Sequence, residues 1–138
     1  MDTNAPESTD AVAATIESRF PDIDIAAGEH YAGLSRDHTT GAWHHVVLLP
    51  ATTDKHLTWQ EAIDWAKSVG GELPTRFESA LLYANLRDQV DTDYWYWTGT
   101  QHEREPSWAW LQYFYYGSQN YTLKGDRSRA CAVRRVPV

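Results

Sequence analysis

Aromatic side chains crowd into one short stretch of this chain. Residues 94–121 hold eleven of its eighteen aromatic residues, mainly in the runs YWYW and WAWLQYFYY. A strand turns successive side chains to opposite faces, so these runs must place aromatic groups on both sides of a sheet. A domain of this size cannot bury them all. We expect one face to be core and the other to contact something that the protein binds, since Tyr and Trp supply large, rigid contact area with a polar tip.

The length and composition suit a single domain. The chain has 138 residues, and 42% of them are hydrophobic, which is enough for a real core. We expect an acidic arm or helix at residues 1–28 and one domain at residues 29–138. Within the arm, the apolar residues of 11–20 fall at helical spacing. Two interpretations of this helix stay open: it packs on its own domain, or it docks on another protein or a sister subunit.

Charge is spread unevenly along the chain. The net charge of -7 argues against nucleic-acid binding, and no apolar run approaches the roughly 20 residues of a membrane helix. The only cysteine, Cys131, has small apolar neighbours and is expected to be a buried structural thiol. Basic residues cluster after residue 123, and we expect them to pair with carboxylates or stack on aromatic rings. They are Lys124, Arg127, Arg129, Arg134 and Arg135.

Local patterns predict strands at both ends of the domain. Residues 28–37 and 42–50 look like the two strands of a hairpin, and we expect the second strand to end at Pro50. After Asp91 the segments YWYWTGT, WAWLQYFYY and RACAVRRV are again strand-like. The order of strands, two helices and strands is an α+β arrangement, and we expect the late strands to form one antiparallel sheet. The tryptophans of these strands are expected to be mainly core.

Two capping boxes predict two helices between the strands. Thr58 with Glu61 opens the first helix, which runs to about Ser68. Thr75 with Glu78 opens the second, which runs to about residue 88. The apolar residues expected on the second helix are Phe77, Leu81, Leu82, Ala84 and Leu86.

Four segments in a fixed order carry a resemblance to a known family. They are LPTRFESALLYANL, YWYWTGTQ, AWLQYFYYGSQ and SRACAVRRV. With them the chain resembles a C-type lectin-like domain family of bacteriophages and prophages, usually filed under unknown function and similar to the C-terminal domain of a bacterial collagen-like adhesin. The resemblance covers about residues 56–136 and implies a C-type lectin-like fold, with two helices packed on an antiparallel sheet. Related domains include targets of diversity-generating retroelements, in which the last strands and loops are rewritten; the matching stretch here is 108–121.

The resemblance implies a noncatalytic ligand-binding module that recognises a host receptor. The expected partner is a host-surface protein or glycan, or another virion protein, and the expected location is a virion tail or surface after synthesis in the bacterial cytoplasm. The alternative is a structural virion protein that uses the same aromatic face as a subunit interface in a homo-oligomer. The candidate ligand-binding residues surround the turn GSQN, where Tyr alternates with Ser, Gln and Asn as in antibody loops. They are Tyr113, Tyr115, Tyr116, Ser118, Gln119, Asn120 and Tyr121.

Residue spacing predicts no enzyme, cofactor or metal. His44 and His45 are adjacent in a strand and point to opposite faces, so they cannot chelate one ion together. No spacing assembles Ser, His and Asp into a catalytic triad. Calcium-dependent lectins present a Glu-Pro-Asn triplet followed by a Trp-Asn-Asp strand. Here Glu105-Pro106-Ser107 is a partial echo, and Trp108-Ala109-Trp110 stands where oxygen ligands would follow.

The missing ligand triplet leads to a testable expectation about calcium. Calcium that binds the folded form raises the melting temperature by mass action. We expect neither calcium nor a chelator to change the melting temperature of this protein, as measured by calorimetry. A rise with calcium that a chelator reverses would show that the loop at Glu105 holds the ion.

Overall fold

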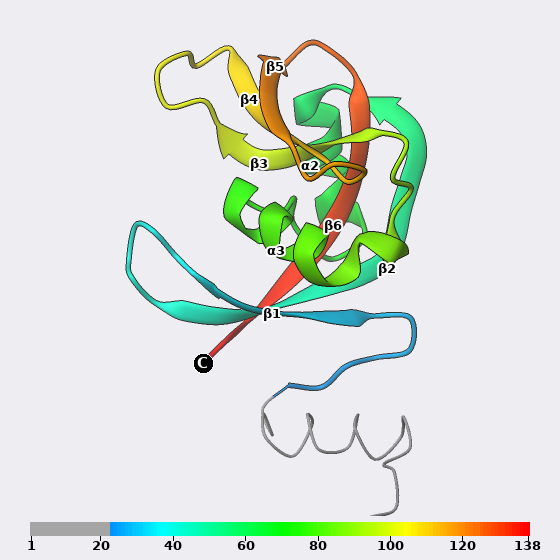
Figure 1. Ribbon diagram of the computed structural model, residues 1–138, viewed down its shortest axis with the longest axis vertical. Helices are drawn as coiled ribbons and strands as arrows, with labels where there is room; N and C mark the ends of the chain where they lie inside the picture. The colour runs from blue at the N-terminus through cyan, green and yellow to red at the C-terminus, as the bar shows by residue number, and fades with distance from the viewer. Residues whose placement is uncertain (1–22) are drawn as a thin grey trace, which may run out of the picture.

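The computed structural model describes residues 23–138 as a six-stranded sheet with two helices (Figure 1). Its elements are β1 (His30–Arg36), β2 (Trp43–Leu57), α2 (Trp59–Ser68), α3 (Arg76–Leu86), the 3₁₀ turn η1 (Arg87–Gln89), β3 (Trp95–Gln101), β4 (Trp108–Tyr113), β5 (Gln119–Leu123) and β6 (Ser128–Pro137). The strand order is β1-β2-β6-β3-β4-β5. Neighbours are antiparallel except β3 and β6, which are parallel. The α+β class is confirmed, and the expected antiparallel sheet is corrected to a mixed one.

Strand β6 lies in the middle of the sheet although it comes after the other strands in sequence. It pairs with β2 along most of its length and meets β3 at one registered pair, Tyr96 with Arg129. It therefore joins the β1–β2 hairpin to the aromatic strands β3, β4 and β5, as Figure 1 shows. An order of helices and strands along the chain does not reveal such an insertion, which is why the parallel pair was not predicted.

The predicted hairpin is confirmed, but its second strand does not end at Pro50. Strand β2 continues to Leu57. The register with β6 shifts between Leu48 and Thr52, and Pro50 is exposed at this irregularity. Proline lacks an amide hydrogen and is tolerated where the ladder is interrupted.

Residues 23–28, the described part of the expected acidic arm, lie with Glu29 against β6. Ile23 is buried. Arg134 donates to the carbonyl oxygen of Asp24 and binds the carboxylate of Glu29 at 2.8 Å. The helix predicted within residues 11–20 lies outside the described residues.

Both predicted capping boxes are confirmed. The Thr58 hydroxyl accepts from the Glu61 amide at 3.3 Å, and the Thr58 amide donates to Glu61 Oε1 at 2.9 Å. The same reciprocal pair joins Thr75 and Glu78 at 3.1 and 2.8 Å. Helix α2 then stops near Gly70, whose φ of +87° suits glycine.

The apolar stripe predicted for helix α3 is confirmed in part, because Leu82 is buried and Leu81 and Leu86 pack against the same core cluster. Phe77 is 47% exposed, and Ala84 is also exposed. The α-helix ends at Leu86 and continues as η1. Two polar residues, Glu78 and Ser79, are buried on the same helix, and the Glu78 carboxylate is hydrogen-bonded inside the fold. The buried residues of α3 are Glu78, Ser79 and Leu82.

The core lies on both faces of the sheet. Trp97 is buried on the face that α2 covers, while its neighbour Tyr96 is buried on the face that α3 covers. Cys131 is fully buried in the second cluster, as predicted, and this burial raises the pKa of its thiol to about 12. Close packing also explains Gly71, because a Cβ there would lie 2.7 Å from the Val133 carbonyl oxygen.

The prediction that the strand tryptophans are mainly core is confirmed for Trp97. Its indole N–H donates to the Leu57 carbonyl oxygen at 2.7 Å. Trp95 is half-buried beside the α2-side core. Trp108 and Trp110 are half-buried on an outer surface, so the prediction is wrong for these two.

The predicted partners of the basic residues after residue 123 are confirmed. Arg129 lies 3.3 Å from the Asp91 carboxylate and 3.5 Å above the Tyr94 ring. Lys124 lies 4.3 Å from the centre of the Trp59 ring. Each arginine of this segment has a carboxylate partner. The pairs are Arg127 with Glu61, Arg129 with Asp91, Arg134 with Glu29, and Arg135 with Glu72 and Glu78.

Glu78 is a buried carboxylate that links α3 to β2 and β6. Its Oε1 accepts from the Thr75 amide and from Arg135 Nη2, both at 2.8 Å. Its Oε2 accepts from His44 Nε2 and Arg135 Nε, both at 2.7 Å. Burial by itself raises the pKa of Glu78, but hydrogen bonds from Arg135 and Thr75 and the Arg135 charge outweigh it. The pKa is therefore held below its ordinary value of 4.5, and the group stays ionised.

The Thr75 cap gives a first stability prediction. Replacing Thr75 with Ala removes the acceptor for the Glu78 amide and should cost about 1 kcal/mol in the free energy of unfolding. Denaturant titration measures this cost. Thr52→Ala is a control, because Thr52 is exposed and has no capping role; an equal loss in both variants would contradict the assignment.

Glu78 gives a second prediction, with a pH dependence. Glu78→Gln leaves Arg135 without its buried counter-charge and should cost about 3 kcal/mol at neutral pH. Because the folded pKa is lowered, the wild-type advantage is complete above the ordinary carboxyl pKa of 4.5 and disappears as the pH falls through the folded value. Denaturant titrations at several pH values measure both effects.

Glu72→Gln is the matched control for that experiment. Glu72 pairs with the same arginine, but its side chain is 65% exposed, so its loss should cost about 1 kcal/mol or less. Equal costs for both variants would contradict the role given to the buried carboxylate.

Candidate functional site: aromatic groups on strands β3 to β5

A tight turn between β4 and β5 holds the centre of the predicted site. The Tyr113 amide donates to the Ser118 carbonyl oxygen at 2.8 Å, and the Gly117 amide donates back to the Tyr113 carbonyl oxygen at 3.0 Å. Phe114 is buried and meets Tyr96 edge-on, with 5.3 Å between ring centres. One aromatic residue of the turn thus anchors it to the α3-side core, while the next two residues are exposed.

Three predicted residues form a cluster that we call the tyrosine turn: Tyr113, Tyr115 and Tyr116. Tyr113 stacks on Trp95, its partner across β3 and β4, with ring centres 4.9 Å apart and 15° between the planes. Tyr115 meets Tyr116 edge-on at 4.6 Å. Tyr115 is 55% exposed and Tyr116 is 74% exposed. The tyrosine turn is therefore an exposed aromatic group with a firmly packed base.

A second cluster, the indole cluster, consists of His102, Trp108, Trp110 and Tyr121. Tyr121 stacks on Trp108 with ring centres 4.9 Å apart, and His102 stacks on Trp110 at 5.6 Å. The two pairs are joined by edge contacts, including Tyr121 with Trp110 at 5.2 Å. Tyr121 is the most exposed ring of the cluster at 40%.

Charged groups flank the indole cluster. The Arg76 guanidinium lies 3.4 Å from the centre of the Trp110 ring, a cation–π contact. The indole N–H of Trp110 donates to Glu103 at 3.2 Å. The pKa of Glu103 is lowered by a hydrogen bond from its own backbone amide and by the bond from Trp110, so this exposed carboxylate is ionised. The cluster thus offers flat rings beside one positive and one negative group.

The two clusters lie on opposite faces of the sheet. Tyr113 and Trp110 are three residues apart in β4, and strand parity turns them to different sides. Tyr121 pairs with Trp110 across β4 and β5 and shares its side. The expectation of one face holding both Tyr113 and Tyr121 is therefore wrong; the residues share the outer end of the sheet but not a face.

The predicted polar residues have separate environments. Ser118 and Asn120 are exposed. Gln119 is committed to the fold: its amide nitrogen donates to the Arg76 carbonyl oxygen at 2.6 Å and to Gln112 at 2.9 Å. Its oxygen accepts from Arg76 Nε at 3.0 Å. Gln119 thus positions Arg76 over the indole cluster instead of facing solvent.

Asn120 lies in a shallow groove of about 610 Å³ on the tyrosine-turn side of β5. Trp95 and Leu111 contribute apolar surface to this groove. Polar side chains occupy the remaining positions, and Thr122 donates to Asp126. The groove extends the tyrosine turn along the edge strand. Its residues are Trp95, Leu111, Asn120, Tyr121, Thr122, Asp126, Arg127 and Ser128.

Several contributors to this region were not predicted as site residues. Trp108 and Trp110 were expected in the core, and His102, Arg76 and Trp95 were not singled out as site residues. The alternation of side chains along YWYW correctly predicts that Trp95 and Trp97 share a face. The pairing of Trp95 with Tyr113 could not be predicted, because it depends on the register between β3 and β4. Arg76 opens a helix far from β4 in sequence, so no local pattern signals its contact with Trp110. His102 follows β3 directly, and its approach to the rings depends on the loop.

Glu78, the buried acid among residues 23–138, is fully hydrogen-bonded within the fold. Both Glu78 oxygens already accept two hydrogen bonds each. His44 and His45 have different partners, as predicted: His44 binds Glu78, and His45 Nδ1 lies 2.9 Å from the Tyr31 hydroxyl. The aromatic groups described above suit stacking and hydrogen bonding more than acid–base chemistry.

The chain shows no match to models of known protein families and none to curated proteins. Within residues 23–138 no helix is long and apolar enough to cross a membrane. In the same part of the chain, no three His, Cys, Asp or Glu side chains gather in a way that could hold a metal ion.

Proposed function

We propose that this protein is a noncatalytic ligand-binding module with a C-type lectin-like fold, of phage or prophage origin. In this proposal the tyrosine turn and the indole cluster contact a host-surface protein or glycan from the tail or surface of a virion. The exposure of Tyr115 and Tyr116 is the observation that carries it. Two adjacent aromatic side chains stand in solvent beside a residue, Phe114, that anchors their backbone.

The physical argument is one of contact area at low entropic cost. Tyrosine has few rotatable bonds and a hydroxyl at its tip, so it binds varied surfaces without losing much conformational freedom. The stacking of Tyr113 on Trp95 restricts the base of the tyrosine turn further. Ser118 and Asn120 add exposed hydrogen-bonding groups at the same end of the sheet. This combination favours recognition of a partner surface.

The arrangement also suits a sequence that is rewritten during diversification. Within residues 108–121, the side chains that hold the frame are separate from those in solvent. The buried positions are Ala109, Leu111, Gln112 and Phe114. Changes at Tyr115, Tyr116 or Tyr121 would alter a binding surface without opening the core, which is what a diversity-generating retroelement requires of its target.

The alternative function is a subunit interface in a virion. Leu123 is 51% exposed and pairs with Trp108 across β4 and β5, so the indole cluster has an apolar border. Such a border fits a permanent contact between copies or with another virion protein. Size-exclusion chromatography with light scattering separates the two functions. A monomer supports recognition, whereas an obligate oligomer that covers these rings supports assembly.

Single alanine variants of Tyr115, Tyr116 and Tyr121 test the proposal. Tyr115→Ala and Tyr116→Ala should each change the free energy of unfolding by roughly 0.5 kcal/mol or less, because these side chains are more than half exposed. Tyr121→Ala should cost about 1 kcal/mol, because it also loses the ring contacts with Trp108 and Trp110. Binding to host cells or to a partner virion protein should weaken by about 2 kcal/mol for an anchoring tyrosine. Thermal melting and a cell-binding assay measure the two quantities.

Phe114→Ala is the control, because it removes a buried ring from the same turn. It should cost about 3 kcal/mol or more of stability. If all three tyrosine variants unfold as Phe114→Ala does, the rings belong to the core. If all three bind as wild type, the proposal is wrong.

A further inference from the structure

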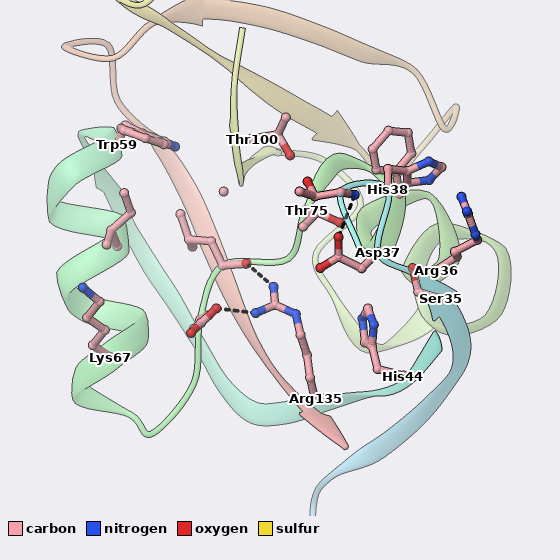
Figure 2. A pocket seen from close by; sticks show the side chains of 16 residues that line it. Ser35, Arg36, Asp37, His38, His44, Trp59, Lys67, Thr75, Thr100 and Arg135 are labelled. Atoms are coloured by element: carbon pink, nitrogen blue, oxygen red, sulfur yellow. Dashed lines mark hydrogen bonds and ion pairs between the residues drawn. The ribbon is translucent and has the colours of Figure 1, made fainter. Parts of the chain in front are cut away.

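A cleft of about 560 Å³ lies between α2 and the tip of the β1–β2 hairpin (Figure 2), and none of its lining residues belongs to the tyrosine turn or the indole cluster. One wall is a stripe of α2, formed by Trp59, Ile63 and Lys67 at spacings of four residues. The tip of the hairpin and the start of α3 form the opposite wall. Leu73 and Arg135 contribute to the floor. The size is within the range of small-molecule sites.

Four apolar side chains line the cleft among polar ones: Trp59, Ile63, Leu73 and Phe77. Trp59 is held in place because its indole N–H donates to the Thr98 carbonyl oxygen at 2.9 Å. Ile63 and Leu73 continue this surface. On the other side, the Phe77 ring packs against His38 with 3.9 Å between ring centres and 34° between the planes, and Phe77 is nearly half-exposed. A ring or a short aliphatic body is the complement of such walls.

The carboxylates of the cleft already have partners. Asp37 Oδ1 accepts from the amides of Thr39 and Thr40 at 2.8 and 3.1 Å, which closes the hairpin turn. Glu72 binds Arg135. Both carboxylates therefore already have hydrogen-bond or ion-pair partners within the protein, and neither needs a bound cation as a partner.

Two cations at the rim of the cleft, unlike its carboxylates, have no ion-pair partner among the described residues. Within residues 23–138, neither Lys67 on α2 nor Arg36 on the hairpin takes part in an ion pair. Both line the cleft, at opposite ends in Figure 2. An anionic group that enters beside either cation would gain an interaction that the protein itself does not supply.

We propose that this cleft binds a small organic acid: an apolar ring or aliphatic body lies between Trp59 and Phe77, and its carboxylate lies against Lys67 or Arg36. The site is separate from the tyrosine turn and the indole cluster. It does not rest on the proposed recognition function, so either proposal can fail alone.

Phenylacetate and phenylacetamide are the probes, because they differ in charge and hardly in shape. Titration is followed by ¹H–¹⁵N NMR at the Trp59 indole and at the Gly99 amide, which also lines the cleft. We expect saturable shifts at these groups, with the acid binding about fivefold more tightly than the amide, as an ion pair at a partly exposed site allows. Added salt should reduce this preference.

Lys67→Met and Arg36→Met should identify the anchoring cation, since one of them should bring the preference for the acid close to one. Lys55→Met is the matched control, because Lys55 is exposed outside the cleft. Tyr116→Ala should bind phenylacetate as wild type does. The proposal is overturned if the acid and the amide bind equally, if neither cleft variant changes the preference, or if no saturable shift occurs at Trp59 and Gly99. Dispersed spectra of each variant confirm that it is folded.

Discussion

The ionised carboxylate of Glu78 is the interaction on which most of this fold depends. It completes the cap of α3, accepts from His44 of β2 and holds the Arg135 guanidinium of β6. A charge this deeply buried is stable only when each of its oxygens has donors, and here the donors come from three separate elements. Helix α3 is thereby fixed against the β2–β6 pair. The same Arg135 also contributes to the floor of the cleft beside α2.

The dependence extends to the aromatic strands through α3. Arg76 begins this helix, and its guanidinium lies over Trp110 while its carbonyl oxygen accepts from Gln119. The position of the helix start therefore sets the position of the indole cluster. On the opposite face, the tyrosine turn rests on Trp95 and needs no contact from Arg76. Its other anchor, Phe114, packs in the core cluster that contains Leu82 of α3, so this helix helps to support both aromatic clusters.

Local chemistry predicted the local elements well. Thr58 and Thr75 identified the helix starts because a capping box is a contact within four residues. Features that depend on residues far apart were missed, including the parallel contact of β6 with β3 and the division of Tyr113 from Tyr121. The alternation of side chains along each single strand could be predicted from the sequence. The face that each strand turns to the core could not, because it depends on the register between strands and on which helix covers the sheet. The burial of Glu78 was also missed, since its partners are 34 and 57 residues away.

The central place of β6 has a consequence for how the domain is made. Every strand on either side of β6 is synthesised earlier. The β1–β2 hairpin and the aromatic strands do not pair with each other, and only β6 pairs with both. The sheet therefore closes only once residues up to Pro137 have left the ribosome, and the contacts that close it are long in sequence. Folding of such a topology is slow compared with that of a helical bundle. A nascent chain that stops within the tyrosine turn would expose its rings without the strand that anchors them.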